Sequence, residues 1–390
     1  MINIKRSLYT LVTISFLFQV IKFFSFFEEY SNWQYVDWII NYQAGFVRRG
    51  LIGEILFRVY QLTSIHLDFL ILVFVVIIII FNSYFLIRSI KYVSKSYINL
   101  LIFLSPGFFL YSIMNSEIIG RKDILMIFVM GFFVFFEKKI NNKSLFLILI
   151  FSLVVLCLSH SGFLFYSQYL LFLYLLIKFK RNLKINIYEF GITTFTLLLM
   201  LMLILLNQGT EFNTTEICLS VKNYVSDKCM LDGQVYWLQH DYERYIHEKT
   251  INGIDYLKSF YIYTTSFFLV YFFLGIRAYK SKFNIDFYNL NKVNPLFIFI
   301  ILFMPTIPTY ILGEDWGRYI FISYSSSFFI FIYCLKENLL ITNYELRLNR
   351  FFHIIVIIFY SFFWTFPFYN ATKFKIVLKK PILSILKNIK

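Results

Sequence analysis

The run LDFLILVFVVIIII, from Leu67 to Ile80, contains a single charged residue, Asp68. A second such run extends from Leu145 to Leu158, and 59% of all 390 residues are hydrophobic. A soluble core does not require runs of this length, whereas a helix needs about 20 apolar residues to cross a bilayer. Strands of a membrane barrel alternate apolar and polar residues, but these runs are apolar on every face. The sequence therefore predicts an all-α, polytopic integral membrane helical bundle.

The same pattern extends outward from this run along the whole chain. The first apolar segment is long and is not followed by a small-x-small cleavage site, so we expect it to be a retained signal anchor. Together the segments predict about eleven transmembrane helices in a single membrane domain, 1–390. Their expected positions are about 8–27, 67–87, 97–113, 124–137, 144–159, 162–177, 189–206, 259–276, 295–312, 320–335 and 351–368.

The basic residues predict which side of the membrane each loop occupies. Short clusters of Lys and Arg mark the cytoplasmic side, which places the N-terminus inside. These clusters contribute much of the positive charge behind the net charge of +15, and their expected partner is the anionic membrane surface and not nucleic acid. The clusters are Lys5-Arg6, Arg88/Lys91/Lys95, Lys138/Lys139/Lys143, Lys178/Lys180/Arg181/Lys184, Arg277/Lys280/Lys282 and Lys336/Arg347/Arg350.

The distinctive polar residues fall on the opposite, outer face. These predicted outer segments are rich in Arg and carboxylates, and Arg is the better bidentate partner for phosphate. An eleven-helix count also puts the basic tail, 372–390, outside, so either one helix is miscounted or the tail is an amphipathic surface helix. The outer segments are 28–66, 114–123, 159–162, 207–258 and 313–319.

The first outer segment begins its polar sequence with Asp37 and Asn41. These residues are four apart and would share one face if the stretch is helical. We expect the nearby Trp33, Tyr35 and Trp38 to anchor this stretch at the level of the lipid headgroups, where amphipathic rings are enriched.

Two arginines, Arg48 and Arg49, follow in the same segment. They are either phosphate ligands or interface cations that extend toward water, and we favour phosphate binding. Gly45 and Gly50 on either side permit close approach of the backbone.

The residues that follow, Gly50 to Leu62, have apolar side chains at helical spacing. We therefore expect the outer segment 28–66 to contain a helix that lies in the membrane interface. Glu54 and Arg58 are four apart and are expected to pair on this helix.

The second and third outer segments contribute Glu117, Arg121, Asp123 and His160. Glu117 and Arg121 are spaced to pair along one helical turn, either as a self-neutralised loop or as part of a site. Asp123 is a substrate ligand or the N-cap of the next helix. His160 has no partner at metal-ligand spacing, so it caps a helix or contacts a hydroxylated or phosphorylated ligand.

The fifth outer segment carries the cluster Glu314 to Arg318, which reads acid, acid, Trp, Gly, Arg. Pro305 and Pro308 precede it and are expected to kink or end their helix near its outer end. Irregular backbone at membrane depth usually lines a cavity. The cluster is therefore an ion pair within the loop or a second part of the site.

The fourth outer segment, 207–258, is too small for an independent domain and is expected to cap the outer cavity. Cys218 and Cys229 lie within it and are candidates for a disulfide, which would contribute roughly 3 kcal/mol. Residues 236–244 mix aromatic and polar side chains in a way that suits sugar binding or an ordinary structural role.

Several function classes lack their motifs. The chain contains no phosphate loop with GKS or GKT, no Gly-x-Ser-x-Gly, no His-Glu-x-x-His and no haem signature. We therefore expect no cofactor and no metal. The inner loops are too short for a nucleotide-sugar domain, so any donor must arrive from the membrane or from the outer side.

Three places in the sequence carry a family resemblance: Asp37, Gly-Phe-Val-Arg-Arg-Gly at 45–50, and Asp-Trp-Gly-Arg at 315–318. At these places the chain resembles membrane enzymes of bacterial surface polysaccharide assembly. These are the O-antigen and capsule repeat-unit polymerases and, more distantly, the GT-C superfamily of glycosyltransferases. In the GT-C pattern a carboxylate in the first outer loop serves as base, and Asp37 stands in the matching place. The paired acidic motif usual there is missing. The resemblance implies the bacterial inner membrane, an outer active face, and chain-length regulator and flippase proteins as partners.

The leading hypothesis is a glycosyltransferase that polymerises undecaprenyl-diphosphate-linked oligosaccharide units. The alternatives are a GT-C-type transferase that decorates a polymer from a polyprenyl-phosphate sugar, a lipid-linked oligosaccharide flippase or other transporter, and a structural membrane protein. The candidate catalytic residues are Asp37, Asp315, Glu314 and His160, and the candidate ligands of lipid phosphate and sugar are Arg48, Arg49, Asn41, Glu117, Arg121, Asp123, Arg318 and Trp316.

Overall fold

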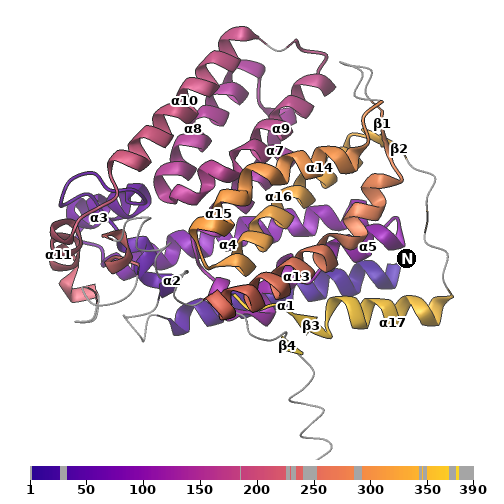
Figure 1. Cartoon of the computed structure of the whole chain (residues 1–390), viewed down its shortest axis with the longest axis horizontal. Helices are drawn as coiled ribbons and strands as arrows, with labels where there is room; N and C mark the ends of the chain where they lie inside the picture. Colours follow the sequence, from indigo (N-terminus) through magenta and orange to yellow (C-terminus); the bar gives the residue numbers. More distant parts are fainter. Residues whose placement is uncertain are drawn as a thin grey trace, which may run out of the picture. The chain divides into compact units, whose positions relative to one another are not determined.

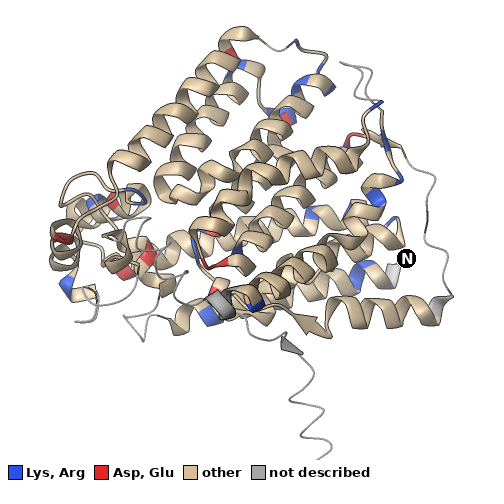
Figure 2. Cartoon of the chain, viewed as in Figure 1, with Lys and Arg blue, Asp and Glu red and all other residues tan. Residues whose placement is uncertain are grey.

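The computed structural model is almost entirely helical, and it has the architecture of an all-α polytopic membrane protein. In the part of the chain that the structure describes, eight helical segments are long and apolar enough to cross a membrane. Figure 2 shows that their ribbons are mostly tan, with the charged residues mainly near their ends and in loops. The described residues are 2–26, 33–184, 186–224, 229, 234–239, 253–284, 292–341, 345, 349–368 and 375–376. Residues 240–244 and nearly all of the predicted tail, 372–390, lie outside them.

The chain divides into two compact units, each discontinuous in sequence. Unit 1 comprises 1–15, 86–118 and 249–390, and unit 2 comprises 16–85 and 119–248. Helices α1 (Ile2–Ser25) and α4 (Leu67–Val93) contribute residues to both.

Unit 2 is built around α8, which contacts α3, α7, α9 and α10; α7 to α10 run side by side in Figure 1. Asn141 caps α8 by accepting a hydrogen bond from the Ser144 backbone N–H, and Thr210 forms a capping box at the start of α11. The further helices of unit 2 are α2 (Trp33–Val36), η1 (Asp37–Ile39), α3 (Leu51–Thr63), α7 (Asp123–Phe136), η3 (Glu137–Lys139), α8 (Asn142–Ser159), η4 (Ser161–Tyr166), α9 (Ser167–Lys180), α10 (Ile187–Leu206), α11 (Glu211–Ser220), η5 (Lys222–Tyr224) and η7 (Tyr236–Leu238).

Unit 1 is organised by α13 (Gly253–Tyr279), which contacts α5, α14 and α16. Almost every side chain of α16 (Trp316–Lys336) is buried, so this helix forms the centre of the unit. Two short antiparallel pairs complete it, β1 with β2 and β3 with β4. The other elements are α5 (Tyr97–Phe103), α6 (Phe109–Met114), η2 (Ser116–Ile118), β1 (Lys282–Phe283), α14 (Pro295–Phe303), η9 (Met304–Thr306), α15 (Ile307–Leu312), β2 (Leu340–Ile341), α17 (Arg350–Ser361), β3 (Trp364–Thr365) and β4 (Lys375–Ile376).

Two predicted helices differ from the observed ones. The expected helix 97–113 is broken between α5 and α6, at Ser105-Pro106-Gly107. Pro106 has no N–H to continue a helix, and a Cβ on Gly107 would lie 2.4 Å from the Val270 side chain. The expected helix 351–368 ends at Ser361, and the chain continues into β3.

The other predicted spans are found as helices, although α7 has only 14 residues. Eight of the eleven expected segments therefore coincide with a helical segment of spanning length, and α5/α6, α7 and α17 do not. The predicted kink at the prolines is confirmed, because α14 ends at Phe303 and the turn η9 separates it from α15.

Candidate functional site

In unit 2, Asp37 begins η1 and its side chain is only 1% exposed. Its carboxylate lies 3.5 Å from the ammonium of Lys122, which is completely buried. A carboxylate that is removed from water requires such a partner, since an isolated buried charge costs several kcal/mol or more. The structure therefore places the predicted base in a buried ion pair.

Lys122 also joins this pair to the two arginines of the same segment. Its ammonium donates a hydrogen bond to the backbone carbonyl of Arg49 at 2.8 Å and lies 5.9 Å from the ring centroid of Trp38. The Trp38 indole N–H in turn donates to the carbonyl of Gly120 at 2.6 Å. From the sequence, Lys122 was expected among the polar residues of the outer face but not among the site residues, although it lies between Arg121 and Asp123.

Positive charge is in excess where these segments meet. We call Asp37, Arg48, Arg49, Arg121, Lys122 and Asp123 the basic cluster; all six belong to unit 2. Among these residues, four cations accompany two carboxylates, a formal surplus of +2. Arg48 and Arg121 are buried, as are both carboxylates. This arrangement favours an anionic ligand.

The backbone of the basic cluster is strained at Arg49. Its φ angle is +96°, which a residue with a side chain rarely adopts. The Arg49 guanidinium donates to the side-chain oxygen of Gln234 at 3.1 Å, and Lys122 holds its carbonyl. Strained residues persist only where their surroundings hold them, and they concentrate at functional sites.

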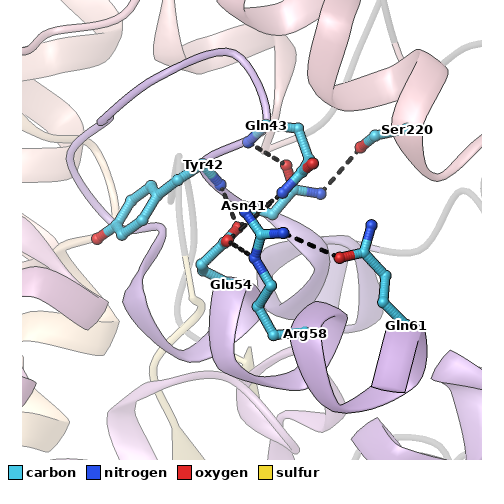
Figure 3. A network of polar contacts seen from close by, with 7 residues as sticks. All are labelled: Asn41, Tyr42, Gln43, Glu54, Arg58, Gln61 and Ser220. Atoms are coloured by element: carbon cyan, nitrogen blue, oxygen red, sulfur yellow. Dashed lines mark hydrogen bonds and ion pairs between the residues drawn. The ribbon is translucent and has the colours of Figure 1, made fainter. Parts of the chain in front are cut away.

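Asn41 does not share a helical face with Asp37, contrary to expectation. Helix η1 ends at Ile39, and Ile40 is extended with ψ 117°. The Asn41 side chain donates to the hydroxyl of Ser220 in α11 at 2.9 Å and accepts from the Gln43 backbone N–H (Figure 3). Asn41 therefore fastens the loop to α11.

The expected pair of Glu54 and Arg58 is present, with 2.6 Å between the two groups, and Glu54 also accepts from the backbone N–H of Tyr42 at 2.8 Å (Figure 3). Gly50 packs closely against the Tyr42 ring and Gly53 on the backbone of Ile40, whereas a Cβ on Gly45 would have no neighbour within 4 Å. Burial, and secondarily the charge of Glu54, raise the pKa of the Tyr42 hydroxyl above its usual range. Helix α3 is thus locked onto residues 40–42.

The proposed headgroup anchors Tyr35 and Trp38 are instead fully buried. The Tyr35 hydroxyl donates to the carboxylate of Asp68, and the ring of Trp38 packs edge-on against Phe74. Their polar atoms find partners inside the protein, so their role is packing and that prediction was wrong.

The described part of 207–258 holds the loop 41–49 at four points. The carbonyl of Asn207 accepts from the Arg48 backbone N–H at 3.2 Å, and the Asn213 side chain donates to the carbonyl of Ala44 at 2.8 Å. Ser220 and Gln234 provide the other two contacts. The structure contains the predicted disulfide between Cys218 and Cys229.

The segment around Arg121 is not the expected helical turn. It reverses at Gly120, whose φ is +72°, so Glu117 and Arg121 are not related by one turn of helix. Asp123 is the first residue of α7 and Lys122 occupies the cap position, so Asp123 is not the N-cap. The buried carboxylate of Asp123 lies instead where the helix dipole favours negative charge.

His160 takes the capping role. Its Nδ1 accepts a hydrogen bond from the Gly162 backbone N–H at 3.1 Å, between α8 and η4. This was one of the two interpretations that its sequence position allowed.

Unit 1 contains the second group of predicted site residues. Arg318 forms an ion pair with Asp315, with 3.4 Å between the two groups, so the expected ion pair within the loop is present. The Trp316 indole N–H donates to the carbonyl of Gly313 at 2.8 Å. We call Glu117, Glu314, Asp315, Arg318 and Tyr263 the acidic cluster, all of which belong to unit 1.

Tyr263 was missed because it lies within the apolar sequence of α13. It interacts electrostatically with Asp315, Glu117 and Glu314, and its ring centroid lies 5.5 Å from that of Trp316. The three carboxylates and one guanidinium give this cluster a formal charge of −2. Among the described residues, no three His, Cys, Asp or Glu side chains are placed to hold a metal ion.

The C-terminal segment that replaces the predicted end of α17 supports this cluster. The Gly317 backbone N–H donates to the carbonyl of Phe368 at 3.2 Å, and a Cβ on Gly317 would lie 2.1 Å from the carbonyl oxygen of Pro367. Asn115 donates to the carbonyl of Phe366 at 2.7 Å. The first turn of α16 is therefore fixed by contacts that only a glycine permits.

Comparisons of the chain with protein-family models, with curated proteins and with solved structures found no match.

Proposed function

We propose that this protein is a membrane glycosyltransferase of surface polysaccharide assembly, which polymerises undecaprenyl-diphosphate-linked oligosaccharide repeat units. The observation that carries the proposal is the surplus of positive charge in the basic cluster. We also propose that the predicted orientation holds, with this cluster on the outer face of the inner membrane.

The charge surplus selects the ligand. Buried arginines are costly without an anion, and the guanidinium fork matches phosphate oxygens with two parallel hydrogen bonds. Within the basic cluster, Asp37 and Asp123 contribute two negative charges against four positive ones. A protein with several spanning helices meets phosphate most readily as the headgroup of a lipid, and a polyprenyl diphosphate carries both the charge and the sugar.

The chemistry of transfer uses the same charge. An acceptor hydroxyl attacks the anomeric carbon, the bond from that carbon to the diphosphate oxygen breaks, and the diphosphate leaves with the bonding electrons. Arg48, Arg49 and Arg121 would stabilise the negative charge that grows on the leaving group. A carboxylate must orient the hydroxyl or accept its proton. Asp37 is the proposed carboxylate, and the ammonium of Lys122 lies 3.5 Å from it.

The test is complementation of a deletion strain, with the length distribution of the surface polysaccharide on a gel as the readout. We expect Arg48→Ala and Arg121→Ala to remove the long chains and leave a single repeat unit on the lipid core. Arg58→Ala is the matched control, because Arg58 belongs to the same unit but its side chain is 57% exposed. A normal ladder from Arg48→Ala protein at wild-type abundance would exclude the basic cluster as the phosphate site.

The same gel separates the alternatives. If the deletion strain makes chains of normal length, the protein decorates a finished polymer and does not make it. If not even one repeat unit reaches the lipid core, the protein acts before polymerisation, as a flippase would.

A further inference from the structure

We infer that the acidic cluster of unit 1 binds an uncharged, hydroxyl-rich saccharide, with Tyr263 as the hydrogen-bonding residue at its inner end. This inference rests on the proposed function and names the part of the substrate that the basic cluster does not hold. From the sequence, Arg318 was expected to bind phosphate together with the other outer arginines. In the structure it is paired with Asp315.

The net charge of the acidic cluster disfavours a phosphate ligand. Arg318 is paired with Asp315 and has three carboxylates in its cluster, so the formal charge there is −2. A phosphate would be repelled by this surplus. Ionised carboxylates accept hydrogen bonds and donate none, so they match the hydroxyl groups of a sugar.

The hydroxyl of Tyr263 is a hydrogen-bonding group that a saccharide could use. Tyr263 is 2% exposed, and its hydroxyl has no hydrogen-bond partner among the described residues. A buried hydroxyl without a partner is costly in a folded protein, and such groups usually have a partner. The carboxylates of Asp315, Glu117 and Glu314 interact electrostatically with Tyr263, and its ring centroid lies 5.5 Å from that of Trp316, the neighbour of Asp315.

The residues of the acidic cluster differ in how far they are exposed, which bears on how a ligand reaches the cluster. Glu314 is exposed, Asp315 and Glu117 are partly exposed, and Tyr263 is buried. The cluster therefore runs from the surface of unit 1 inward. Trp316 packs edge-on against Tyr263 and Phe260 and is itself buried, so it positions the tyrosine ring and does not stack on the sugar.

Direct binding tests this inference without turnover. Neutral hexoses, N-acetylhexosamines and 6-deoxyhexoses would be added to the wild-type protein in lipid nanodiscs, and saturation-transfer NMR would detect their binding. Glucosamine and glucose 1-phosphate would serve as cationic and anionic probes. We expect a neutral saccharide to bind, and Tyr263→Phe to weaken that binding about threefold to tenfold, the effect of one lost hydrogen bond.

Tyr271→Phe is the matched control, since Tyr271 lies on the same helix and its hydroxyl is engaged with Ser327. Glu117→Gln is the second variant and should also weaken binding. The inference is overturned if no neutral saccharide binds, if Tyr263→Phe and Glu117→Gln both bind as the wild type does, or if only glucosamine or glucose 1-phosphate binds. Failure here would leave the effect of Arg48→Ala on chain length unchanged, so the two proposals fail separately.

Discussion

The basic cluster of unit 2 and the acidic cluster of unit 1 contain the same kinds of side chain and differ in their balance. Four cations accompany two carboxylates in the first, whereas three carboxylates accompany one arginine in the second. An arginine next to an aspartate therefore does not identify a phosphate site. The sum of the charges that the fold brings around it decides which ligand the arginine can accept.

The two clusters also differ in how they are held. In the basic cluster, Asn207 holds the Arg48 backbone, Gln234 holds the Arg49 guanidinium and the Asp37 carboxylate holds the Lys122 ammonium. The acidic cluster includes an exposed carboxylate, Glu314. Substitutions in the first should therefore affect stability and activity together, while those in the second should separate the two.

The largest expected effect is that of Lys122→Met. It leaves Asp37 buried without this cation and removes the hydrogen bond to Arg49, so we expect a loss of about 3–5 kcal/mol in the free energy of unfolding. Thermal unfolding in nanodiscs measures it. Asp37→Asn combined with Lys122→Met should recover part of the loss. Arg58→Met should cost less than about 1 kcal/mol, and an equal effect at both sites would contradict the contrast.

Removing the disulfide, with Cys218→Ser and Cys229→Ser together, should cost roughly 3 kcal/mol, because the reduced chain has more conformational freedom when unfolded. The loss should weaken the cover over loop 41–49 and leave neutral saccharide binding by unit 1 unchanged. Unfolding with and without a reductant is the measurement. Reduced saccharide binding in this variant would show that the clusters are not independent.

Gly317→Ala tests the support of the acidic cluster. Its Cβ would collide with the carbonyl oxygen of Pro367, so we expect a loss of about 1–3 kcal/mol and weaker saccharide binding. Gly275→Ala is the control in the same unit, because its nearest neighbour would lie at an ordinary 3.8 Å from the new Cβ. Similar melting temperatures for the two variants would argue against the close contact at Gly317.

The smallest expected effect on stability is that of Glu314→Gln. This exposed substitution should change the free energy of unfolding by less than about 0.5 kcal/mol. It removes one negative charge from the acidic cluster, so repulsion of glucose 1-phosphate should fall while neutral saccharides bind somewhat more weakly. Unchanged discrimination between the two probes would show that net charge does not set the ligand class there.

Local features were readable from the sequence. The apolar runs predicted the long helices, Pro305 predicted the kink, and the spacing of Glu54 and Arg58 predicted their pair. The helices 97–113 and 351–368 were extended too far, because an apolar run does not show where the chain must turn to pack. Pro106 and Gly107 were the signal for a break within 97–113. Pro367 was the signal that 351–368 is not helical to its end.

Helix length and apolar composition are local properties, so they show from the sequence that the chain is a helical membrane protein and where its charged residues gather along it. Which charged residues lie next to one another depends on how the chain folds. The Lys122 ammonium donates a hydrogen bond to the Arg49 carbonyl across 73 residues, and the Tyr263 ring lies beside Trp316 of a separate helix. Such pairings depend on burial and packing between distant segments, and no spacing along the chain encodes them.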